Sequence, residues 1–540
     1  MAATVPAFVV SSMRKVFPDT PVPRPPKEPK PPLARMSAAG GEYEAFQFVL
    51  VPPSGERPDV ESVTVCDLTG DAGTLSAEHV TVRRVQCVWL EHPSHRETRA
   101  GRFPDILMPE VAGRLEGTTS FWVTVHVPPK TRPGLYRGTL SVKPDGLAES
   151  CAIELTVRSF SLPQRPALIT AYGLYDKPMR EQYGDRSDEM LRRFRDNLRA
   201  HRVTHLSFPA TDIPPPVATV KDGRPSVDYT AFDGSVEENL KYGLNALDVP
   251  APLRYHAREC RLELPHGEDA TTKILADYQQ HLEERGWLDM AYFFVIDEPG
   301  DKHIADLRHT HELLARGAPR IKRRCDFGYG AYGHGGGIEP QVAKYRQLAG
   351  LFEIWVPHID CVDYDFLSER QAKGDWVWWY ICCSAVHPYP NFLVDYPGVD
   401  NRVPFWMLHK YGVNGFAYWT VNWWKDDVFR HCVTFGTAVG DGLLVYPGPD
   451  GPIDSIRWEI MRDGFEDYEY LAMLSSLIAE AEEAGVAADA LAGARAALAK
   501  TDLVAASAIS YTNEPAVIEQ VRAAVADQIE ALRAALGKRD

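Results

Sequence analysis

The sequence predicts a multidomain protein with an N-terminal β-sandwich, a central (β/α)8 barrel of the TIM type and a C-terminal helical region. Its 540 residues exceed the usual size of one compact domain. Short β-rich runs occupy residues 1–165, strand-like and helix-like patterns alternate over 166–440, and helical patterns follow over 441–540. These changes of pattern set the three predicted domains.

The first region contains six runs of alternating or β-branched residues separated by proline and glycine clusters, at spacings typical of a sandwich. The runs cover residues 45–51, 60–67, 80–90, 120–127, 138–143 and 152–160. The proline-rich, basic stretch 18–32 predicts an extended crossing of the surface. Residues 161–166 predict the linker to the barrel.

Eight strands with helical patterns between them are predicted in the central region. The strands cover residues 168–174, 203–208, 247–250, 290–296, 321–326, 352–356, 376–382 and 413–419. The clearest helical patterns cover residues 188–201, 271–285, 302–314 and 340–348. Alternation of strand and helix indicates a parallel sheet, and eight repeats indicate a barrel.

The last region shows apolar residues at intervals of three and four, which is typical of amphipathic helices. The predicted helices cover residues 453–481, 487–499 and 514–536. We expect them to pack against the barrel, because no strict heptad pattern runs through them.

Composition narrows the range of partners and compartments. A net charge of −16 disfavours nucleic acid and anionic membranes as partners, and no apolar run approaches the ~20 residues of a membrane helix. Nine scattered cysteines without a Cys-x-x-Cys pair, and basic residues that follow the first apolar run, predict a cytoplasmic protein without a signal peptide in this sequence. The alternative is a secreted protein from which a leader has been removed. Neither a cofactor nor a metal is expected, and a homo-oligomer remains open.

Two adjacent carboxylates, Asp297 and Glu298, end the apolar strand pattern of the fourth strand and precede Pro299. The carboxyl ends of parallel strands carry the chemistry of barrels. The proline is expected to keep Glu298 extended. The alternative is that Asp297 only caps the next helix, which begins near Asp301.

Aromatic and polar side chains gather near the predicted ends of strands five to eight. Barrel interiors favour Val, Ile and Leu, so rings in this number indicate a surface that stacks on sugars. The predicted substrate-binding residues are Asp326, Trp355, His358, Trp379, Tyr380, Tyr418, Trp419, Asn422 and Trp424. About half of the rings are expected to pack between barrel and helices instead, among them Trp376 and Trp378 or their neighbours on the opposite strand face.

Paired carboxylates in an aromatic pocket predict glycoside hydrolysis. Neighbours in sequence are too close to flank a glycosidic bond, but they suit a mechanism in which the 2-acetamido group of the substrate is the nucleophile. Glu298 would then be the acid, and Asp297 would orient the acetamido group. A glycosidase for other sugars would need a second carboxylate, for which Asp326, Asp360 and Asp363 are the candidates. A carbohydrate-binding protein without activity is the third alternative.

Other motifs favour no competing function. The Gly-x-Gly-x-x-Gly pattern at residues 328–333 lacks a helix directly after it, so it predicts a loop over the pocket instead of a dinucleotide site. The histidine pairs at 92 and 95 and at 309 and 311 lack further ligands at metal spacing. A Gly-x-Ser-x-Gly elbow is absent, which argues against an α/β-type serine hydrolase.

Several motifs in the C-terminal half resemble those of a known enzyme family. They are Phe-Val-Ile-Asp-Glu-Pro at 294–299, Trp-Val-Pro at 355–357, Trp-Tyr at 379–380 before Pro-x-Pro-Asn at 388–391, Gly-Phe-Ala-Tyr-Trp at 415–419 with Asn-x-Trp at 422–424, and the long stretch from Gly-Asp-Gly at 440–442 to Arg-Asp-Gly-Phe-Glu-Asp-Tyr-Glu-Tyr-Leu at 462–471. Over about residues 167–475 the chain resembles glycoside hydrolase family 123. The resemblance implies a retaining β-N-acetylgalactosaminidase-type enzyme that forms an oxazolinium intermediate, with Glu298 as acid/base and Asp297 as stabilising residue.

The acid-rich stretch 462–471 also has a structural interpretation. Four acids and one arginine crowd a single predicted helix, and Asp463 and Asp467 share a face. With Arg457 and Arg462 nearby, the pattern predicts ion pairs that bind this helix to the barrel.

Overall fold

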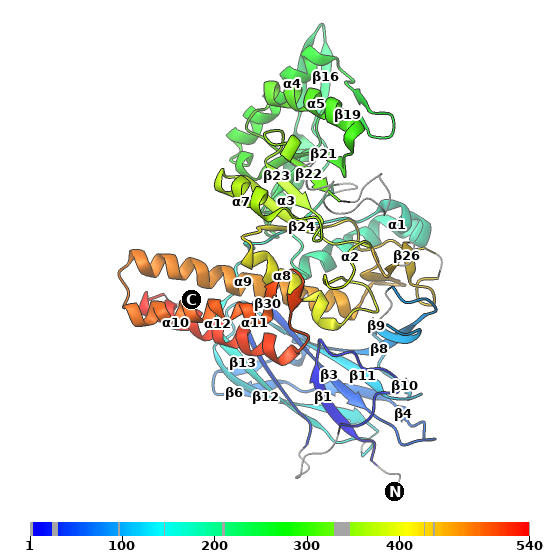
Figure 1. The fold of residues 1–540 in the computed structure, drawn as a ribbon. Coiled ribbons are helices and arrows are strands. Elements are labelled where there is room, and N and C mark those ends of the chain that lie inside the picture. The colour runs from blue at the N-terminus through cyan, green and yellow to red at the C-terminus, as the bar shows by residue number, and fades with distance from the viewer. Residues whose placement is uncertain are drawn as a thin grey trace.

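The structure of the protein is a computed structural model, which describes residues 4–23, 31–94, 98–144, 146–207, 211–328, 346–425, 427–435 and 438–538. Figure 1 shows the N-terminal sheets at the bottom, the parallel barrel at the top, and the long C-terminal helices between them and projecting to one side. No helix in the described ranges combines the length and apolarity of a membrane span.

The N-terminal region forms two sheets that share one apolar core. The first has the order β1 (Ala7–Ser11), β3 (Glu42–Leu50), β11 (Thr119–Val127), β8 (Val80–Leu90) and β9 (Gly101–Met108). The second has the order β2 (Leu33–Gly40), β13 (Cys151–Ser161), β12 (Gly134–Lys143), β6 (Leu68–Gly70) and β7 (Gly73–Leu75), and β5 (Ser62–Val65) also pairs with β12. Phe48 and Phe121 from the first sheet meet Ile153 and Leu155 from the second. Alternate residues of β13 are buried, as expected for a strand with one face in the core and the other exposed to solvent.

All six predicted runs of this region overlap observed strands, whereas the longer strands β1, β2 and β9 were not predicted. β9 contains Pro104, which lacks a backbone donor and lies beside an irregularity in the pairing with β8. β2 contains three alanines and a glycine, which have low strand preference, and its partner β13 holds it in place. Residues 24–30 of the predicted proline-rich crossing 18–32 lie outside the described residues.

The central region contains each of the eight predicted strands, in one parallel sheet that nearly closes into a barrel. The spatial order is β15 (His205–Leu206), β14 (Ile169–Tyr172), β25 (Gly415–Tyr418), β24 (Trp376–Tyr380), β23 (Ile354–Pro357), β22 (Lys322–Phe327), β21 (Ala291–Asp297) and β18 (Leu247–Asp248). The two end strands are short, covering residues 205–206 and 247–248. A hydrogen bond links the two end strands: Ser207 Oγ, just after β15, donates to Asp248 Oδ2 of β18 at 2.8 Å.

Helices follow most of the barrel strands, as the alternating pattern predicts. They are α1 (Asp176–Tyr183), α2 (Ser187–Ala200), α3 (Thr230–Leu240), α4 (Glu268–Glu284), α5 (Ile304–Gly317), α7 (Tyr364–Ala372) and α8 (Val403–Lys410). The predicted helix 340–348 lies mostly outside the described residues. Two hairpins were not predicted: β16 (Val217–Lys221) with β17 (Arg224–Asp228), at the far tip in Figure 1, and β19 (Arg254–His256) with β20 (Arg261–Glu263).

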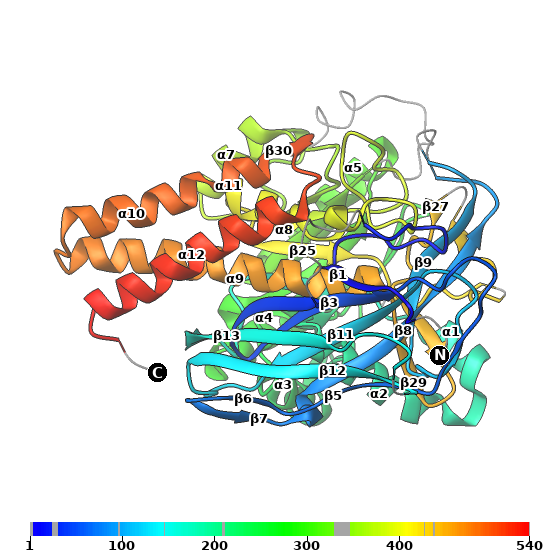
Figure 2. The same ribbon diagram turned by 90° about the horizontal axis from the view of Figure 1, so that it is seen from below.

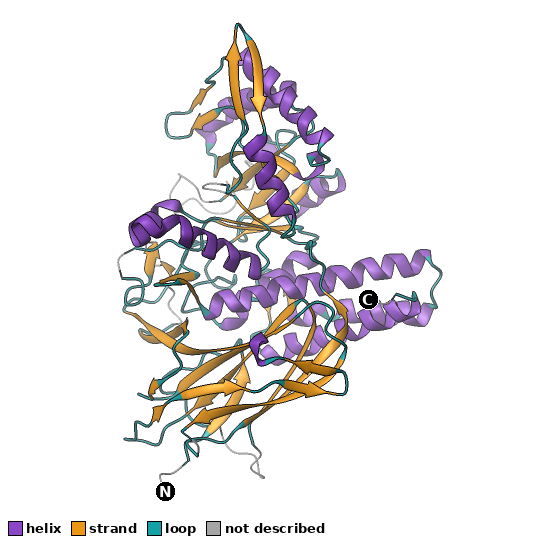
Figure 3. Cartoon of the chain, turned by 180° about the vertical axis from the view of Figure 1, so that it is seen from behind, coloured by secondary structure: helices purple, strands orange, loops and turns teal. Residues whose placement is uncertain are grey.

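After the barrel, small antiparallel pairs lead into the C-terminal helices. The pairs are β26 (Val433–Phe435) with β27 (Ala438–Val439) and β28 (Val445–Gly448) with β29 (Gly451–Asp454). The helices are α9 (Ile456–Glu483), α10 (Ala488–Ala499), α11 (Thr501–Val504) and α12 (Pro515–Ala535), and a short hairpin of β30 (Ala505–Ser507) and β31 (Ser510–Tyr511) precedes α12. Figures 2 and 3 show α9, α10 and α12 lying side by side along the N-terminal sheets.

The first half of α9 packs against α8 of the barrel, as expected, and also against the N-terminal sheets. Every residue of its segment 456–471 is buried, the charged ones included. On one side Arg457 binds Asp105 of β9, and on the other Asp467 binds Arg402 before α8. Neither Arg457 nor Arg462 forms the predicted ion pair to the barrel, because the first pairs with the N-terminal sheets and the second pairs with Glu459 of α9 itself. The ion pair on the barrel side comes from Arg402.

Candidate active site

The carboxylate pair lies at the carboxyl end of β21, at the mouth of the barrel. Asp297 is the last residue of the strand and lies opposite Asp326 of β22, and the backbone N–H of Glu298 donates to the Asp326 carbonyl at 3.0 Å. In the next helical turn, Asp301–His303, Gly300 takes the capping position and its N–H donates to His303 Nδ1 at 2.8 Å. The alternative that Asp297 only caps this turn is therefore wrong.

Glu298 does not have the extended conformation that its following proline predicts. Its φ is +43°, in the left-handed region that residues with a Cβ rarely occupy. The restriction imposed by Pro299 favours extended backbone at Glu298, so the observed conformation departs from that preference as well. Strained backbone of this kind persists where surrounding contacts hold it, and it concentrates at functional positions.

The surroundings of Glu298 are built closely around its carboxylate. The hydroxyl of Tyr380, at the end of β24, donates a hydrogen bond to Glu298 Oε1. A Cβ at Gly328 would collide with both Glu298 Oε1 and Tyr380 Oη, so any side chain there would displace these two groups. Gly328 is the first glycine of the Gly-x-Gly-x-x-Gly pattern, and the rest of that pattern lies outside the described residues.

Asp297 reaches solvent at the mouth but lies close to other acids. The surrounding protein and the charges of Glu298 and Asp326 raise the pKa of its carboxyl well above the usual range, and Arg324 counteracts them. The raised pKa favours the protonated form of Asp297 in the protein without substrate.

Asp326 forms a bidentate ion pair with Arg324 inside the barrel. Arg324 Nε and Nη2 donate to its two oxygens at 2.8 and 2.6 Å. The guanidinium also donates to Ser207 Oγ and lies over the ring of Trp378. Asp326 therefore supports the floor of the site and has both oxygens engaged.

An aromatic cluster of Tyr175, Trp419 and Trp423 lies beside the carboxylates. Burial and the charge of Asp297 raise the pKa of the Tyr175 hydroxyl, so the two groups are near enough to interact electrostatically. Ring centroids lie 6.2 Å apart between Tyr175 and Trp419, 5.1 Å between Tyr175 and Trp423, and 5.3 Å between the two tryptophans. All three side chains are half-buried. Asn422 is fully buried and clamps Tyr175, accepting from its N–H and donating to its carbonyl at 2.8 Å.

Tyr175 and Trp423 were not among the predicted site residues. Tyr175 follows the first strand directly, so its position at a strand end could have indicated it. Trp423 lies between Asn422 and Trp424, two residues that the sequence analysis predicts to bind substrate.

Four of the predicted substrate-binding residues pack against other aromatic side chains of the protein. Trp355 packs against Phe352 and Phe366 under α7, and Trp379 packs against Tyr364 and Tyr411. Trp424 lies against the rings of α1 and α2 and donates to the Val445 carbonyl, and the Tyr418 ring lies against Tyr172. The rings of Trp355 and Trp379 face the helices because alternate residues of a strand point to opposite sides, whereas Trp376 and Trp378 face the barrel interior.

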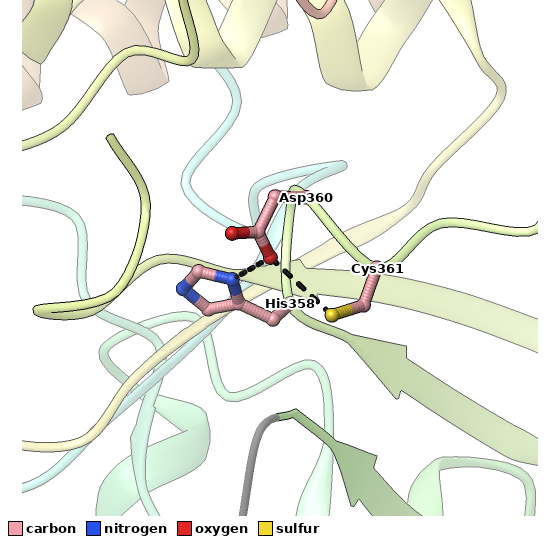
Figure 4. Close-up of side chains that lie close together, drawn as sticks. All are labelled: His358, Asp360 and Cys361. Atoms are coloured by element: carbon pink, nitrogen blue, oxygen red, sulfur yellow. Dashed lines mark hydrogen bonds and ion pairs between the residues drawn. The ribbon is translucent and has the colours of Figure 1, made fainter. Parts of the chain in front are cut away.

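His358 lies behind Tyr380 in a hydrogen-bonded group with Asp360 and Cys361, drawn in Figure 4. Its Nδ1 bonds Asp360 Oδ1, and its Nε2 accepts from the backbone N–H of Cys382 at 3.1 Å. The ring is fully buried and meets Tyr380 edge-on at 4.9 Å between centroids. His358 thus holds the end of β24 in place and does not reach the mouth.

The same three residues could offer ligand atoms to a metal, and so could His201, Asp454 and Glu459. In the first group Asp360 Oδ1 already accepts from His358 and from Cys361 Sγ, the latter at 3.3 Å. In the second group the guanidinium of Arg83 binds both acids. These hydrogen bonds and ion pairs take the oxygens that a cation would need.

Comparison with known proteins agrees with this geometry. The family model described as the glycoside hydrolase 123 catalytic domain matches residues 253–474. This segment belongs to glycoside hydrolase family 123. Its C-terminal limit agrees with the resemblance inferred from motifs, whereas its N-terminal limit lies after β18 instead of at the start of the barrel.

The solved structure of a family 123 glycoside hydrolase from Clostridium perfringens, studied for glycolipid glycan hydrolysis, has a TM-score of 0.65 to this chain at 15% identity and covers 98% of both chains. At that identity the likeness shows the fold alone. A family 5 xyloglucanase from Bacteroides ovatus covers 80% of this chain and 98% of its own at a TM-score of 0.28 and 8% identity, which is too low to carry an argument. No curated protein matches the chain in sequence.

The family 123 segment supports a glycoside hydrolase acting on a carbohydrate substrate. It contains Asp297, Glu298, Tyr380 and the two tryptophans of the aromatic cluster. Tyr175 lies outside it, so the first barrel strand completes the site from beyond the matched segment.

Proposed function

We propose that the protein is a retaining glycoside hydrolase that removes a terminal 2-acetamido-2-deoxy-β-hexoside, of the N-acetylgalactosaminide type, by substrate-assisted catalysis. Glu298 is the acid/base and Asp297 is the partner of the acetamido group. We further propose a TIM-type barrel, with domain limits near residues 165 and 440. Strand β13 ends at Ser161 and β14 begins at Ile169, which supports the first limit.

One observation carries the mechanism: each candidate for a second carboxylate is already engaged. Asp326 is held by Arg324, and Asp360 accepts from His358 and Cys361. Asp363 caps α7 and pairs with Arg346 at 3.0 Å. With these three engaged elsewhere, a nucleophile supplied by the substrate is the scheme that the geometry supports best.

In the first step Glu298 gives its proton to the glycosidic oxygen, and the bond from that oxygen to C1 breaks. The acetamido oxygen forms a bond to C1 from the other face, and the positive charge spreads over the oxazolinium ring. Asp297 accepts the acetamido N–H and stabilises this charge. In the second step Glu298 takes a proton from water, whose oxygen bonds to C1 and reopens the ring, so the configuration is retained.

The remaining groups fit roles in binding. The Tyr380 hydroxyl fixes the orientation of the Glu298 carboxyl. Tyr175, Trp419 and Trp423 form an aromatic wall on which the apolar face of a sugar ring can stack. The Clostridium perfringens enzyme is described as acting on glycolipid glycans, and a glycan end with a 2-acetamido sugar is the corresponding substrate class here.

The test compares nitrophenyl β-glycosides with and without the 2-acetamido group. We expect cleavage of the acetamido sugars only, inhibition by a thiazoline analogue, and a fall in kcat of at least about 10²-fold for Glu298→Gln. Glu312→Gln, a substitution on the outer helix α5 away from the barrel mouth, is the matched control and should change nothing.

Three outcomes would contradict the proposal. Full activity of Glu298→Gln would remove the acid assignment. Cleavage of plain hexosides without thiazoline inhibition would favour a glycosidase with a second carboxylate. Sugar binding by the wild type without any cleavage would favour a non-catalytic binding protein.

A further inference from the structure

We propose that Asp441 is a positioning residue that holds Trp419 in the aromatic wall and ties the loop of residues 440–442 to the end of β25. The proposal rests on the proposed function, in which Trp419 stacks on the sugar. Asp441 belongs to the Gly-Asp-Gly motif at residues 440–442, which the mechanism above does not use.

The carboxylate of Asp441 receives two donors from consecutive residues at the barrel mouth. The indole N–H of Trp419 donates to Oδ2 and the hydroxyl of Tyr418 donates to Oδ1, each at 3.1 Å. The Tyr418 oxygen in turn accepts from the backbone N–H of Gly442 at 2.9 Å. Asp441 is 1% exposed, so these bonds are made away from bulk water.

The backbone around Asp441 is shaped for this contact. Gly440 and Gly442 have φ of +83° and +70°, which favour glycine. A Cβ at Gly442 would collide with the indole ring of Trp419, so this glycine lets the ring lie directly against the loop. Thr434 Oγ1 donates to the Asp441 carbonyl and anchors the turn.

The held ring is linked to the carboxylate pair through Tyr175. Trp419 contacts Tyr175 and Trp423, and the charge of Asp297 acts on the Tyr175 hydroxyl. A shift of the indole would therefore move the surface beside the carboxylate pair. The charge of His358 and a hydrogen bond from the backbone N–H of Cys383 also stabilise the ionised form of Asp441. The loop after β24 therefore contacts Asp441 as well.

Burying a carboxylate costs free energy, because the group loses its contacts with water and only well-formed hydrogen bonds offset that loss. An apolar residue would suffice for packing alone. The two oxygens fix two neighbouring side chains in direction as well as position, which packing without hydrogen bonds does not do.

The test is a double-mutant cycle with Asp441→Asn and Trp419→Phe, measured on the aryl glycoside that the wild type cleaves best. The amide introduced by Asp441→Asn would leave one donor unpaired, so we expect KM to rise about tenfold with kcat within about twofold. In the Trp419→Phe background, which has no indole N–H, Asp441→Asn should change KM less than about twofold. Asp450→Asn, a solvated acid, is the control.

A second readout needs no substrate. In protein labelled with 5-fluorotryptophan, the ¹⁹F resonance that is lost in Trp419→Phe should shift in Asp441→Asn and stay in place in Asp450→Asn. This spectrum still decides on Asp441 if the wild type cleaves no glycoside, in which case only the proposed function fails. Equal effects of Asp441→Asn on KM in both backgrounds, a loss of kcat alone, or an unmoved Trp419 resonance would each overturn the proposal.

Discussion

At the scale of single residues, the site depends on close approach as much as on charge. Glu298 is held in a left-handed conformation, receives the Tyr380 hydroxyl and has Gly328 directly against its carboxylate. These contacts come from the ends of three strands of one sheet, β21, β22 and β24. A side chain added at Gly328 therefore tests the geometry without touching a charged group.

We expect Gly328→Ala to lower kcat/KM by about 10²-fold, because the added methyl must displace the Glu298 carboxyl from its position. The free energy of unfolding should change by less than about 2 kcal/mol, since the atoms nearest to the methyl are the ends of two side chains. Steady-state kinetics and urea unfolding check the two statements.

Gly234 of α3 is the matched control for that substitution. No atom lies within 4 Å of the position that a methyl group would take there, so Gly234→Ala should leave the kinetics unchanged and stabilise the helix by about 1 kcal/mol. Unchanged kinetics in Gly328→Ala would contradict the importance of this contact.

At the scale of elements, α9 connects the N-terminal sheets to the barrel through buried charges. Arg457 donates to both oxygens of Asp105 at 2.8 Å and to three backbone carbonyls, and both side chains are fully buried. Breaking one partner of such a pair leaves the other charge buried without compensation.

Asp105→Asn should lower the free energy of unfolding by about 3 kcal/mol, because Arg457 loses its ionised partner while the shape is kept. Urea unfolding monitored by circular dichroism measures it. Glu482→Gln breaks the exposed pair with Arg495 and should cost less than about 1 kcal/mol. Equal effects of the two substitutions would show that the buried pair contributes no more than a surface one.

At the scale of the whole molecule, several buried acids link stability to pH. Burial raises the pKa of Asp463 to about 7 and the pKa values of Asp400 and Glu466 to about 8. Between the ordinary carboxyl range and these values the folded protein keeps protons that the unfolded chain releases. Stability must therefore fall as pH rises toward 8. Burial also lowers the pKa of His205 to about 3, an opposing effect that is confined to pH below about 6.5.

The free energy of unfolding should thus decrease between pH 6.5 and 8. Asp400→Asn should reduce the slope by about 1.4 kcal/mol per pH unit, because it removes one of the retained protons. Urea unfolding across this range measures the slopes, with the exposed Asp71→Asn as control. An unchanged slope in Asp400→Asn would mean that Asp400 is ionised in the folded protein.

The order of patterns along the chain is enough to predict the architecture and the position of the carboxylate pair. Alternation of strand and helix patterns predicts all eight barrel strands, and the Asp-Glu pair at the end of the fourth lies at the mouth because parallel strands carry their carboxyl ends there. Period and order along the chain are local properties, so a single sequence contains them.

Which side chains meet is settled by the folded molecule alone. Strands buried on both faces show no polar alternation, so the sequence does not reveal that Trp378 faces inward while Trp355 and Trp379 face the helices. The binding of Asp105 by Arg457, the burial of the charged half of α9 and the contact of Tyr175 with Trp423 depend likewise on packing between distant segments. Spacing along the chain carries no information on such contacts, because they form only when the layers come together.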